Sequence, residues 1–544
     1  MSGSTACCRF PVLLVLLLFL LVAGEGRSEA AGDCDTLLAV KKDWGNPPAL
    51  NSWDPAVAAD HCNWTGVTCA TGGGGGVVTA LTLSDLNLTG SVPASVCALT
   101  SLARLDLSYN NLTGAFPAAA LYPCAGLTFL DLSNNQLSGP LPRDIDGLSP
   151  AMEHLNLSTN GFAGEVPPAV ARLPALKSLL LNTNLFTGAY PAAEISKLAG
   201  LDTLTLADNL FAPAPVPTEF ANLTYLWMEK MNLTGEIPAE FASLTELTTF
   251  SMASNRLTGS IPAWVWQRQK LQNLYLFDNR LSGELTRNVT AVNLVELDLS
   301  NNQLTGEMPE DFGKLSNLAV LFLYKNQLTG TIPASIGLLP RLKDIRLFDN
   351  RLSGELPPEL GKHSPLGNIE VAINNLSGPL RETLCANGKL FGIVAFNNSF
   401  SGEVPAKLGD CVTLNSLILH NNLFSGDFPA KIWSFPLLTL VMIHNNSFTG
   451  ALPPHIASNI SRIEMGNNMF SGSFPTSAPG LKVFHAENNR LGGELPSDMS
   501  KLANLTDLSV PGNRITGSIP TSIKLLQKLN TLDLRGNRIS GAIP

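Results

Sequence analysis

The sequence predicts an α/β solenoid of about twenty repeats of about 24 residues, preceded by an N-terminal cap that contains cysteines. Three observations support this fold class. The pattern L-x-x-L-x-L-x-x-N-x-L-x-G-x-I-P recurs from about residue 78 to the end of the chain, for example from Leu318 to Pro333. Its asparagine returns about every 24 residues, from Asn110 to Asn537. Glycine and proline recur with the same spacing, which excludes a disordered or collagen-like chain.

The period and the L-x-x-L-x-L-x-x-N core are the signature of leucine-rich repeats, which coil into a superhelical horseshoe with one short strand per repeat. The leucines point inward and stack on those of the next coil. The asparagines form a second ladder, because a buried amide satisfies backbone groups that leave the sheet at each bend. Leu86 and Met231 replace asparagine in two repeats, and Phe211 to Pro215 replace a glycine turn. We therefore expect an irregular coil near residues 209 to 238.

The first 30 residues have the order of a secretory signal peptide. Arg9 precedes an apolar stretch from Phe10 to Ala23, and small residues follow it. This stretch is too short to span a bilayer comfortably, and no later segment approaches about 20 consecutive apolar residues. We assign residues 1–30 to the signal peptide, 33–77 to the N-terminal cap domain and 78–544 to the repeats. We expect the mature chain to pass through the secretory pathway to the extracellular side of the plasma membrane.

Charge and glycosylation sequences agree with that location. The formal charge of -9 argues against a nucleic-acid binder, which would need a basic face. Twelve Asn-x-Ser/Thr sequences fit a glycosylated extracellular surface. They lie at Asn63, Asn87, Asn111, Asn156, Asn222, Asn232, Asn288, Asn375, Asn397, Asn445, Asn459 and Asn504.

The cysteines predict three disulfides. Cys62 and Cys69 stand just before the first repeat and are expected to close the cap. Two further pairs share one register on adjacent coils, which favours coil-to-coil disulfides over zinc ligands in an oxidising compartment. These pairs are Cys97 with Cys124 and Cys385 with Cys411. Cys34 is left over, as a free thiol, an intermolecular partner or a further cap cysteine.

No set of residues predicts catalysis. Residues 311–313 spell the Asp-Phe-Gly of protein kinases, but the other kinase motifs are missing. His420, His444 and His485 occupy equivalent positions on nearby coils and allow two interpretations, a metal site or histidines that face solvent or a ligand. No carboxylate or thiolate joins them in register, which favours the second. We predict no catalytic residue, no metal and no cofactor.

The concave face is the most informative surface. Counting back from each asparagine, positions −5 and −3 point to the core, so −6, −4 and −2 point outward. Repeats one to six present mostly small polar residues there, whereas later repeats present eight large aromatics. These are Tyr225, Trp227, Tyr275, Phe277, Phe322, Tyr324, Phe348 and Phe396. A contiguous apolar stripe indicates an interaction site, which we favour over rings that only pack on one another across strands.

The stripe has room for an extended peptide of about ten residues, because it crosses seven strand spacings of about 4.8 Å. Charged side chains beside it are candidate contacts. Arg346 could accept a carboxylate of the ligand, or it could pair with Asp344 or Asp349 instead. Glu229 and Glu370 could meet cations.

The motif L-T/S-G-x-I-P in nearly every repeat, with the cap sequence C-N-W-T-G-V-T-C, resembles the extracellular part of plant leucine-rich-repeat receptor kinases over about residues 33 to 544. Segments 144–150, 384–390 and 459–464 are similar to the HAESA-like group. The resemblance implies a cell-surface receptor that faces the apoplast, binds a small secreted peptide and then recruits a co-receptor kinase. Because the chain ends within a repeat at Pro544, a C-terminal cap, a membrane span and a Ser/Thr kinase are expected beyond it.

One departure separates this sequence from the better-known members of that group. They carry an Arg-x-Arg pair that holds the terminal carboxylate of the peptide, whereas Ser416 and Ile418 occupy the matching positions here. The resemblance is therefore to a branch that lacks the pair and reads a different peptide. The alternative function is a secreted inhibitor of a cell-wall-degrading enzyme, or a soluble decoy receptor.

Overall fold

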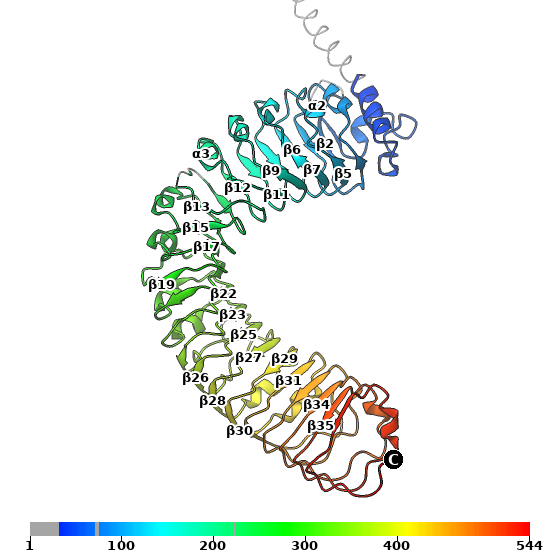
Figure 1. Cartoon of the computed structure of the whole chain (residues 1–544), viewed down its shortest axis with the longest axis vertical. Helices are drawn as coiled ribbons and strands as arrows, with labels where there is room; N and C mark the ends of the chain where they lie inside the picture. Colours follow the sequence, from blue (N-terminus) through cyan, green and yellow to red (C-terminus); the bar gives the residue numbers. More distant parts are fainter. Residues whose placement is uncertain (1–31, 71–75, 219, 221–222) are drawn as a thin grey trace, which may run out of the picture. The chain divides into compact units, whose positions relative to one another are not determined.

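The computed structural model describes residues 32–70, 76–218, 220 and 223–544 (Figure 1). These residues form two compact units. The first runs to Thr234 and includes Pro238–Asn255, and the second contains Gly235–Ile237 and Arg256–Pro544. The predicted signal peptide and Asn222 lie outside the described residues. Each unit is a leucine-rich-repeat solenoid with one strand of a parallel sheet per coil, as the repeat pattern predicts.

The N-terminal cap begins with a helix over residues 32–43. The 3-10 helices η1 (Pro48–Leu50) and η2 (His61–Asn63) follow, and β1 (Val67–Cys69) pairs antiparallel with β2 (Val78–Thr82). The Trp53 and Trp64 rings stack at 6.2 Å in the small core of the cap. Asp33 Oδ2 accepts the Val78 N–H at 2.7 Å, which ties the first helix to the first repeat strand.

The main sheet of the first unit is a parallel ladder in which each strand pairs with that of the next coil. Its strands are β2, β4 (Arg104–Asp106), β6 (Phe129–Asp131), β8 (His154–Asn156), β10 (Ser178–Leu180), β12 (Thr203–Thr205), β14 (Tyr225–Trp227) and β16 (Thr249–Ser251).

The second unit continues the same construction through twelve parallel strands. They are β18 (Asn273–Tyr275), β20 (Glu296–Asp298), β22 (Val320–Phe322), β23 (Asp344–Arg346), β25 (Asn368–Glu370), β27 (Gly392–Val394), β29 (Ser416–Ile418), β31 (Leu440–Met442), β33 (Arg462–Glu464), β34 (Val483–His485), β35 (Asp507–Ser509) and β36 (Thr531–Asp533).

The rest of the coil holds, in most coils, a second short strand and a helical turn. The short strands are β3 (Thr89–Gly90), β5 (Asn111–Gly114), β7 (Gln136–Pro140), β9 (Gly161–Gly164), β11 (Leu185–Phe186), β13 (Ala214–Pro215), β15 (Leu233–Gly235), β17 (Arg256–Leu257), β19 (Ser282–Glu284), β21 (Gln303–Thr305), β24 (Ser353–Gly354), β26 (Asn375–Gly378), β28 (Ser399–Gly402), β30 (Leu423–Asp427) and β32 (Ser447–Thr449). The helical turns are η3 (Ala94–Ala98), α2 (Ala118–Leu121), η4 (Ile145–Gly147), η5 (Pro168–Arg172), α3 (Ala192–Ile195), η6 (Ala239–Ser243), η7 (Ala263–Gln267), η8 (Glu310–Lys314), η9 (Ala334–Leu338), η10 (Ala406–Asp410), η11 (Ala430–Ser434), η12 (Ser500–Leu502) and η13 (Thr521–Leu525).

The repeat asparagines satisfy backbone groups of their own and the preceding coil. Asn326 Nδ2 donates to the carbonyl oxygens of Leu299 at 3.0 Å, Leu323 at 3.1 Å and Tyr324 at 3.3 Å. Its Oδ1 accepts the Leu304 N–H at 3.0 Å. One amide therefore occupies four backbone groups that would otherwise be buried without partners. The same pattern recurs along both units, as the second ladder in the sequence predicts.

The coil that carries Met231 keeps its place in the ladder. Its strand β14 pairs in register with β12 and β16. The backbone N–H groups of Met231 and Leu233 both donate to Asn255 Oδ1 at 3.0 Å. The irregularity lies instead in the coil that starts at Asn209, where Pro213 takes the place of the glycine with positive φ found four residues after the asparagine position in every other coil.

Candidate functional site

The side chains that point outward from the parallel strands form what we call the strand face of each unit. Around β22, Leu321 and Leu323 are fully buried, whereas Val320, Phe322 and Tyr324 are half-buried. This is the alternation predicted from the asparagine position, because successive residues of a strand point to opposite faces of the sheet.

The ten predicted ligand-binding residues are divided between the units. Tyr225 and Trp227 lie on β14 of the first unit. The second unit carries the other eight, on or directly after five of its strands. These eight are Tyr275, Phe277, Phe322, Tyr324, Arg346, Phe348, Glu370 and Phe396. All ten are half-buried, so each offers part of its side chain to a ligand. The strand face of the second unit is therefore the larger candidate site.

Three aromatic rings pack together across β22 and β23. The rings of Tyr324 and Phe348 stack with centroids 4.4 Å apart and planes 9° apart. The Phe322 ring lies 6.2 Å from that of Tyr324 in a tilted arrangement. Such pairs stabilise each other by about 0.5–1.5 kcal/mol beyond their buried area. The rings therefore pack across strands and also remain accessible, so both interpretations of the aromatic stripe describe part of the arrangement.

Arg346 pairs with carboxylates of its own and the next strand. Its NH2 nitrogen lies 2.8 Å from Asp344 Oδ2, and its Nε lies 3.7 Å from Glu370 Oε1. Its guanidinium carbon sits 4.7 Å from the centroid of the Phe322 ring, a cation–π arrangement. Hydrogen bonding to Asp344 raises the pKa of Arg346 above its usual value. Of the two pairings that the sequence left open, the structure has Asp344 rather than Asp349, and it adds Glu370.

A glycine and an asparagine position these two carboxylates. Asn368 is almost fully buried and donates to Asp344 Oδ1 at 3.2 Å and to Glu370 Oε1 at 2.9 Å. A Cβ atom on Gly392 would lie 2.5 Å from Asn368 Oδ1, so only glycine leaves room for this amide. The absence of a side chain at residue 392 thus fixes the carboxylates around the Arg346 guanidinium.

Other acidic groups near the predicted aromatics also have partners. The Tyr275 hydroxyl donates to Glu296 Oε2 across β18 and β20. In the first unit, the Ser251 hydroxyl donates to Glu229 Oε1 at 2.6 Å. Desolvation and the nearby Glu229 charge raise the pKa of Tyr225, which stays protonated. These groups act as neutral or negative features of the strand face.

Sequence reasoning recognised the equivalent positions of His420 and His444 but missed that their rings stack with Phe396 at position −2 of consecutive coils. Phe396 stacks on His420 at 4.5 Å, and His420 stacks on His444 at 4.3 Å. Burial lowers the pKa of both histidines, that of His420 to about 4, which favours the neutral form of both rings. When the coils are aligned on their asparagines, the three residues fall at the same position, and this alignment could have predicted the stack.

The stack does not form a metal site. Its imidazole planes are 14° from parallel, so their nitrogens do not converge on one point. Within the described part of the chain, the potential metal ligands that do converge are His61, Cys62 and Cys69. The two sulfurs of that group are joined in a disulfide and cannot bind an ion as thiolates.

The first unit carries a comparable stack that the sequence analysis did not anticipate. The Arg104 guanidinium lies 3.4 Å from the centroid of the Phe129 ring, and Phe129 stacks on His154 at 4.2 Å. The expectation of mostly small polar residues on early coils is incomplete for this reason. Around the stack, Asp131 accepts hydrogen bonds from Asn156 and Ser133.

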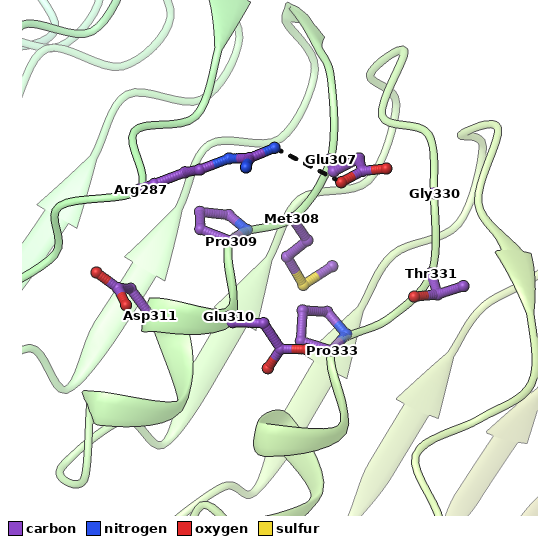
Figure 2. A pocket seen from close by; sticks show the side chains of 9 residues that line it. All are labelled: Arg287, Glu307, Met308, Pro309, Glu310, Asp311, Gly330, Thr331 and Pro333. Carbon is purple, nitrogen blue, oxygen red and sulfur yellow. Dashed lines mark ion pairs between the residues drawn. The ribbon is translucent and has the colours of Figure 1, made fainter.

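A cavity of about 330 Å³ lies outside the strand face, in loops that contain Arg287, Glu307 and Pro333 (Figure 2). Its acidic groups already have partners, since Asp311 lies 2.7 Å from Lys314 Nζ and Glu310 Oε2 accepts from the Ser335 hydroxyl at 2.8 Å. Arg287 and Glu307 face each other across its rim at 3.8 Å. Phe312, in the Asp-Phe-Gly sequence, is fully buried, so that sequence is part of an ordinary coil.

The chain matches two models of leucine-rich-repeat families. Residues 30–70 match the leucine rich repeat N-terminal domain, and residues 77–137 and 292–352 match the leucine rich repeat. The structure of the Arabidopsis receptor kinase HAESA, in complex with the peptide hormone IDA and the co-receptor SERK1, is 35% identical in sequence. It superposes with a TM-score of 0.88 over 93% of this chain and 86% of that chain. The chain belongs to the leucine-rich-repeat ectodomains of plant receptor kinases.

More distant comparisons agree with this assignment. The plant peptide hormone receptor RGFR1 in complex with RGF2 is 29% identical, with a TM-score of 0.71 over 89% of this ectodomain and 84% of that chain. The receptor protein kinase WSS1 of Oryza sativa subsp. japonica is 43% identical over 112 residues, 21% of this chain and 11% of that protein. The matched segment thus covers about a tenth of this kinase. The described residues of the ectodomain contain no kinase domain, and no described helix has the length and apolar character needed to cross a membrane.

The described residues contain three disulfides, and they join the pairs that the cysteine spacing predicts. They are Cys62–Cys69 in the cap, Cys97–Cys124 in the first unit and Cys385–Cys411 in the second. Cys34 is unpaired, and burial raises the pKa of its thiol. The cysteines thus link the cap and two pairs of adjacent coils.

One predicted glycosylation site lies on the strand face. Asn156 on β8 donates to Asp131 Oδ2 at 2.8 Å and accepts from the Ser158 hydroxyl at 2.7 Å. Asn397 and Asn445 stand at the edge of the strand face in an exposed ladder of amides, in which Asn421 donates to Asn397 and Asn445 donates to Asn421. Glycosylation of these sites remains a prediction.

Proposed function

We propose that this ectodomain binds a small secreted peptide across the strand face of its second unit and signals together with a co-receptor kinase. The observation that carries the proposal is the half-buried aromatic surface of β22 and β23, where Phe322, Tyr324 and Phe348 lie beside the paired Arg346. Contiguous accessible apolar surface of this kind marks sites of interaction. An extended backbone that crosses parallel strands can place a side chain against each of them.

Related structures support a peptide as the ligand. HAESA was solved with the peptide hormone IDA and the co-receptor SERK1, and RGFR1 was solved with RGF2. We propose that Tyr225 and Trp227 of the first unit also contact the peptide, and that the whole protein carries a membrane span and a Ser/Thr kinase. We also place the protein in a HAESA-like branch without the Arg-x-Arg pair, because Ser416 and Ile418 stand at the matching positions.

Calorimetric titration of the purified ectodomain with synthetic peptides tests this proposal. The peptides are segments of about ten residues from small secreted plant proteins. We expect at least one to bind, and Phe322→Ala to weaken that binding more than tenfold, because aromatic anchors dominate interface energetics. Phe129→Ala is the matched control, since it removes from the first unit an outward ring that, like Phe322, lies beneath an arginine guanidinium.

Two outcomes would contradict the proposal. One is that no peptide binds, while the ectodomain inhibits a cell-wall hydrolase in an activity assay, which would favour the secreted inhibitor. The other is that Phe322→Ala and Phe129→Ala weaken peptide binding equally, which would place the ligand elsewhere. A soluble decoy would bind the peptide but would not associate with the co-receptor in the presence of the peptide.

A further inference from the structure

Three consecutive strands of the second unit carry no formal charge on their strand face. We call their nine outward residues the uncharged patch. They are Gly392, Val394 and Phe396 from the β27 coil, Ser416, Ile418 and His420 from the β29 coil, and Leu440, Met442 and His444 from the β31 coil. Gly392 is buried, and the other eight are half-buried. The patch is therefore an accessible surface with aliphatic, aromatic and imidazole groups.

The two imidazoles of the patch make no hydrogen bond through Nδ1, and only His444 has a carboxylate within ion-pair distance among the described residues. The Nδ1 atoms of His420 and His444 are buried and accept or donate no hydrogen bond. The rings are stacked on each other and on Phe396, so a charge on one would face an apolar ring or a second imidazole. The nearest carboxylate oxygen, Glu464 Oε2, lies 3.5 Å from His444 Nδ1. Burial also lowers the pKa of both histidines, that of His420 to about 4, which favours the neutral form of the rings.

The arginines at both edges of the patch are already neutralised. On one side, Arg346 lies between Asp344 and Glu370, which leaves a surplus of negative charge. On the other side, Arg462 pairs with Glu464 on the same strand. A ligand carboxylate that approached either guanidinium would therefore compete with a carboxylate that is already in place.

These observations decide which ligand groups the patch can accept. A carboxylate placed here would lose its water without gaining a cation, which is costly, whereas an apolar side chain would gain from burial. We propose that the uncharged patch is a subsite for an apolar, uncharged stretch of the peptide ligand and that it excludes a ligand carboxylate. Three strands span about 10 Å, which corresponds to about three residues of extended peptide. This inference rests on the proposed function, because only the strand β25 separates the patch from the aromatic surface of β22 and β23, so that a peptide crossing the strand face would reach both.

Selection from a random decapeptide library displayed on phage tests the inference. The library is selected on the wild-type ectodomain, on Ile418→Arg and on Leu180→Arg, and the bound phage are sequenced. Leu180 is the matched control, because it is a half-buried aliphatic residue at the equivalent strand position in the first unit. Melting temperature and secretion yield of each variant establish that it folds.

For wild type we expect enrichment of peptides with a run of about three apolar, uncharged residues. Replacing the central residue of that run by Asp should weaken binding at least tenfold. Ile418→Arg should weaken binding of the apolar peptide at least tenfold and improve binding of its Asp variant, because it supplies the missing cation. Leu180→Arg should change neither affinity by more than twofold.

The possible failures are distinguishable. Enrichment of Asp- or Glu-containing peptides by wild type would overturn the inference without any variant. Binding of a selected peptide that Phe322→Ala weakens but Ile418→Arg leaves unchanged would also overturn it, while the proposed function would stand. If wild type enriches no peptide at all, both proposals fail.

Discussion

The strand faces of the two units use one backbone for two different surfaces. On the early coils of the first unit, polar side chains satisfy one another, as where the Ser108 hydroxyl donates to Asp106 at 2.7 Å and Asn156 donates to Asp131 at 2.8 Å. On the second unit, rings such as Tyr324 and Phe348 stack and stay accessible. The buried leucines and asparagines are the same in both. The comparison teaches that the repeated buried residues stabilise both units. The outward residues can vary, and they determine what each strand face binds.

The largest expected effect tests whether the two cores are equivalent. Asn326→Leu in the second unit and Asn135→Leu in the first each remove one amide that serves four backbone groups. We expect each variant to lower the free energy of unfolding by about 3 kcal/mol, because buried backbone groups lose their partners. Urea denaturation, with hydrogen exchange to locate the loosened coils, measures the effect.

Asn421→Gly is the control for this pair. Asn421 is exposed, its amide bonds only to side chains in the exposed ladder, and glycine keeps its positive φ. Its loss should change the free energy of unfolding by less than about 1 kcal/mol. Equal losses for the buried and the exposed asparagine would refute the role of the ladder.

The next effect asks whether the ligand extends onto the first unit. Trp227→Ala removes the largest outward ring of β14. If Trp227 is a contact of the same peptide, its loss should weaken binding by about 2 kcal/mol or more, as at other interface hot spots. Calorimetry with a peptide that binds wild type measures the change. An affinity within twofold of wild type would confine the site to the second unit and strengthen the contrast between the strand faces of the two units.

A smaller effect compares the two paired arginines. Asp344→Asn removes the carboxylate that lies 2.8 Å from Arg346, whereas Asp106→Asn removes one that lies 3.4 Å from Arg104 in the first unit. Both pairs are partly solvated, so the expected losses in the free energy of unfolding are about 1 kcal/mol for Asp344→Asn and less for Asp106→Asn. Chemical denaturation at low salt measures both. The reverse order would show that Asn368 and Glu370 hold Arg346 without Asp344.

A further contrast between the two units is the dependence of their stability on pH. His420 in the second unit and His154 in the first both have lowered pKa values, mainly because of burial, and that of His420 falls to about 4. The unfolded chain takes up a proton as the pH falls below about 6.5, whereas folded His420 does so only near 4. Stability that is present at neutral pH is therefore lost progressively between about pH 6.5 and 4.

His420→Phe keeps a ring in the stack and removes this proton uptake, so its midpoint of denaturation should fall less on acidification than that of wild type. His154→Phe should flatten the profile less, because Asp131, Asp106 and Asp202 favour the protonated form of His154 and oppose its desolvation. Denaturation midpoints measured between pH 7 and pH 4 test both. A profile of His420→Phe that matches wild type would show that other groups cause the acid sensitivity.

The repeat period predicted most of the fold, because spacing alone places leucines such as Leu321 inside and the residues between them outside. It also placed the cysteines of adjacent coils in register. It could not predict how Arg346 pairs, since Asp344 and Asp349 are both close in sequence. Glu370 becomes a partner only because β23 and β25 align Arg346 with it, and the sequence analysis did not compare neighbouring coils at that position.

The need to compare neighbouring coils also explains which features of the candidate site were missed. The stack of Phe396, His420 and His444 is a column across coils, not a motif along the chain. The stack of Arg104, Phe129 and His154 was overlooked for the same reason. Reading the outward positions as columns recovers both stacks. The neutral state of the histidines depends on burial, which the sequence does not provide.

The disulfides between adjacent coils have a consequence for mechanical load. A solenoid that is pulled from both ends can unwind one coil at a time. Cys97–Cys124 and Cys385–Cys411 enclose segments with sequence separations of 27 and 26 residues. Tension cannot extend the chain between bonded cysteines, so each disulfide prevents the release of up to about 90 Å of extended chain. When unwinding reaches either disulfide, the enclosed coil therefore cannot extend while the disulfide is intact.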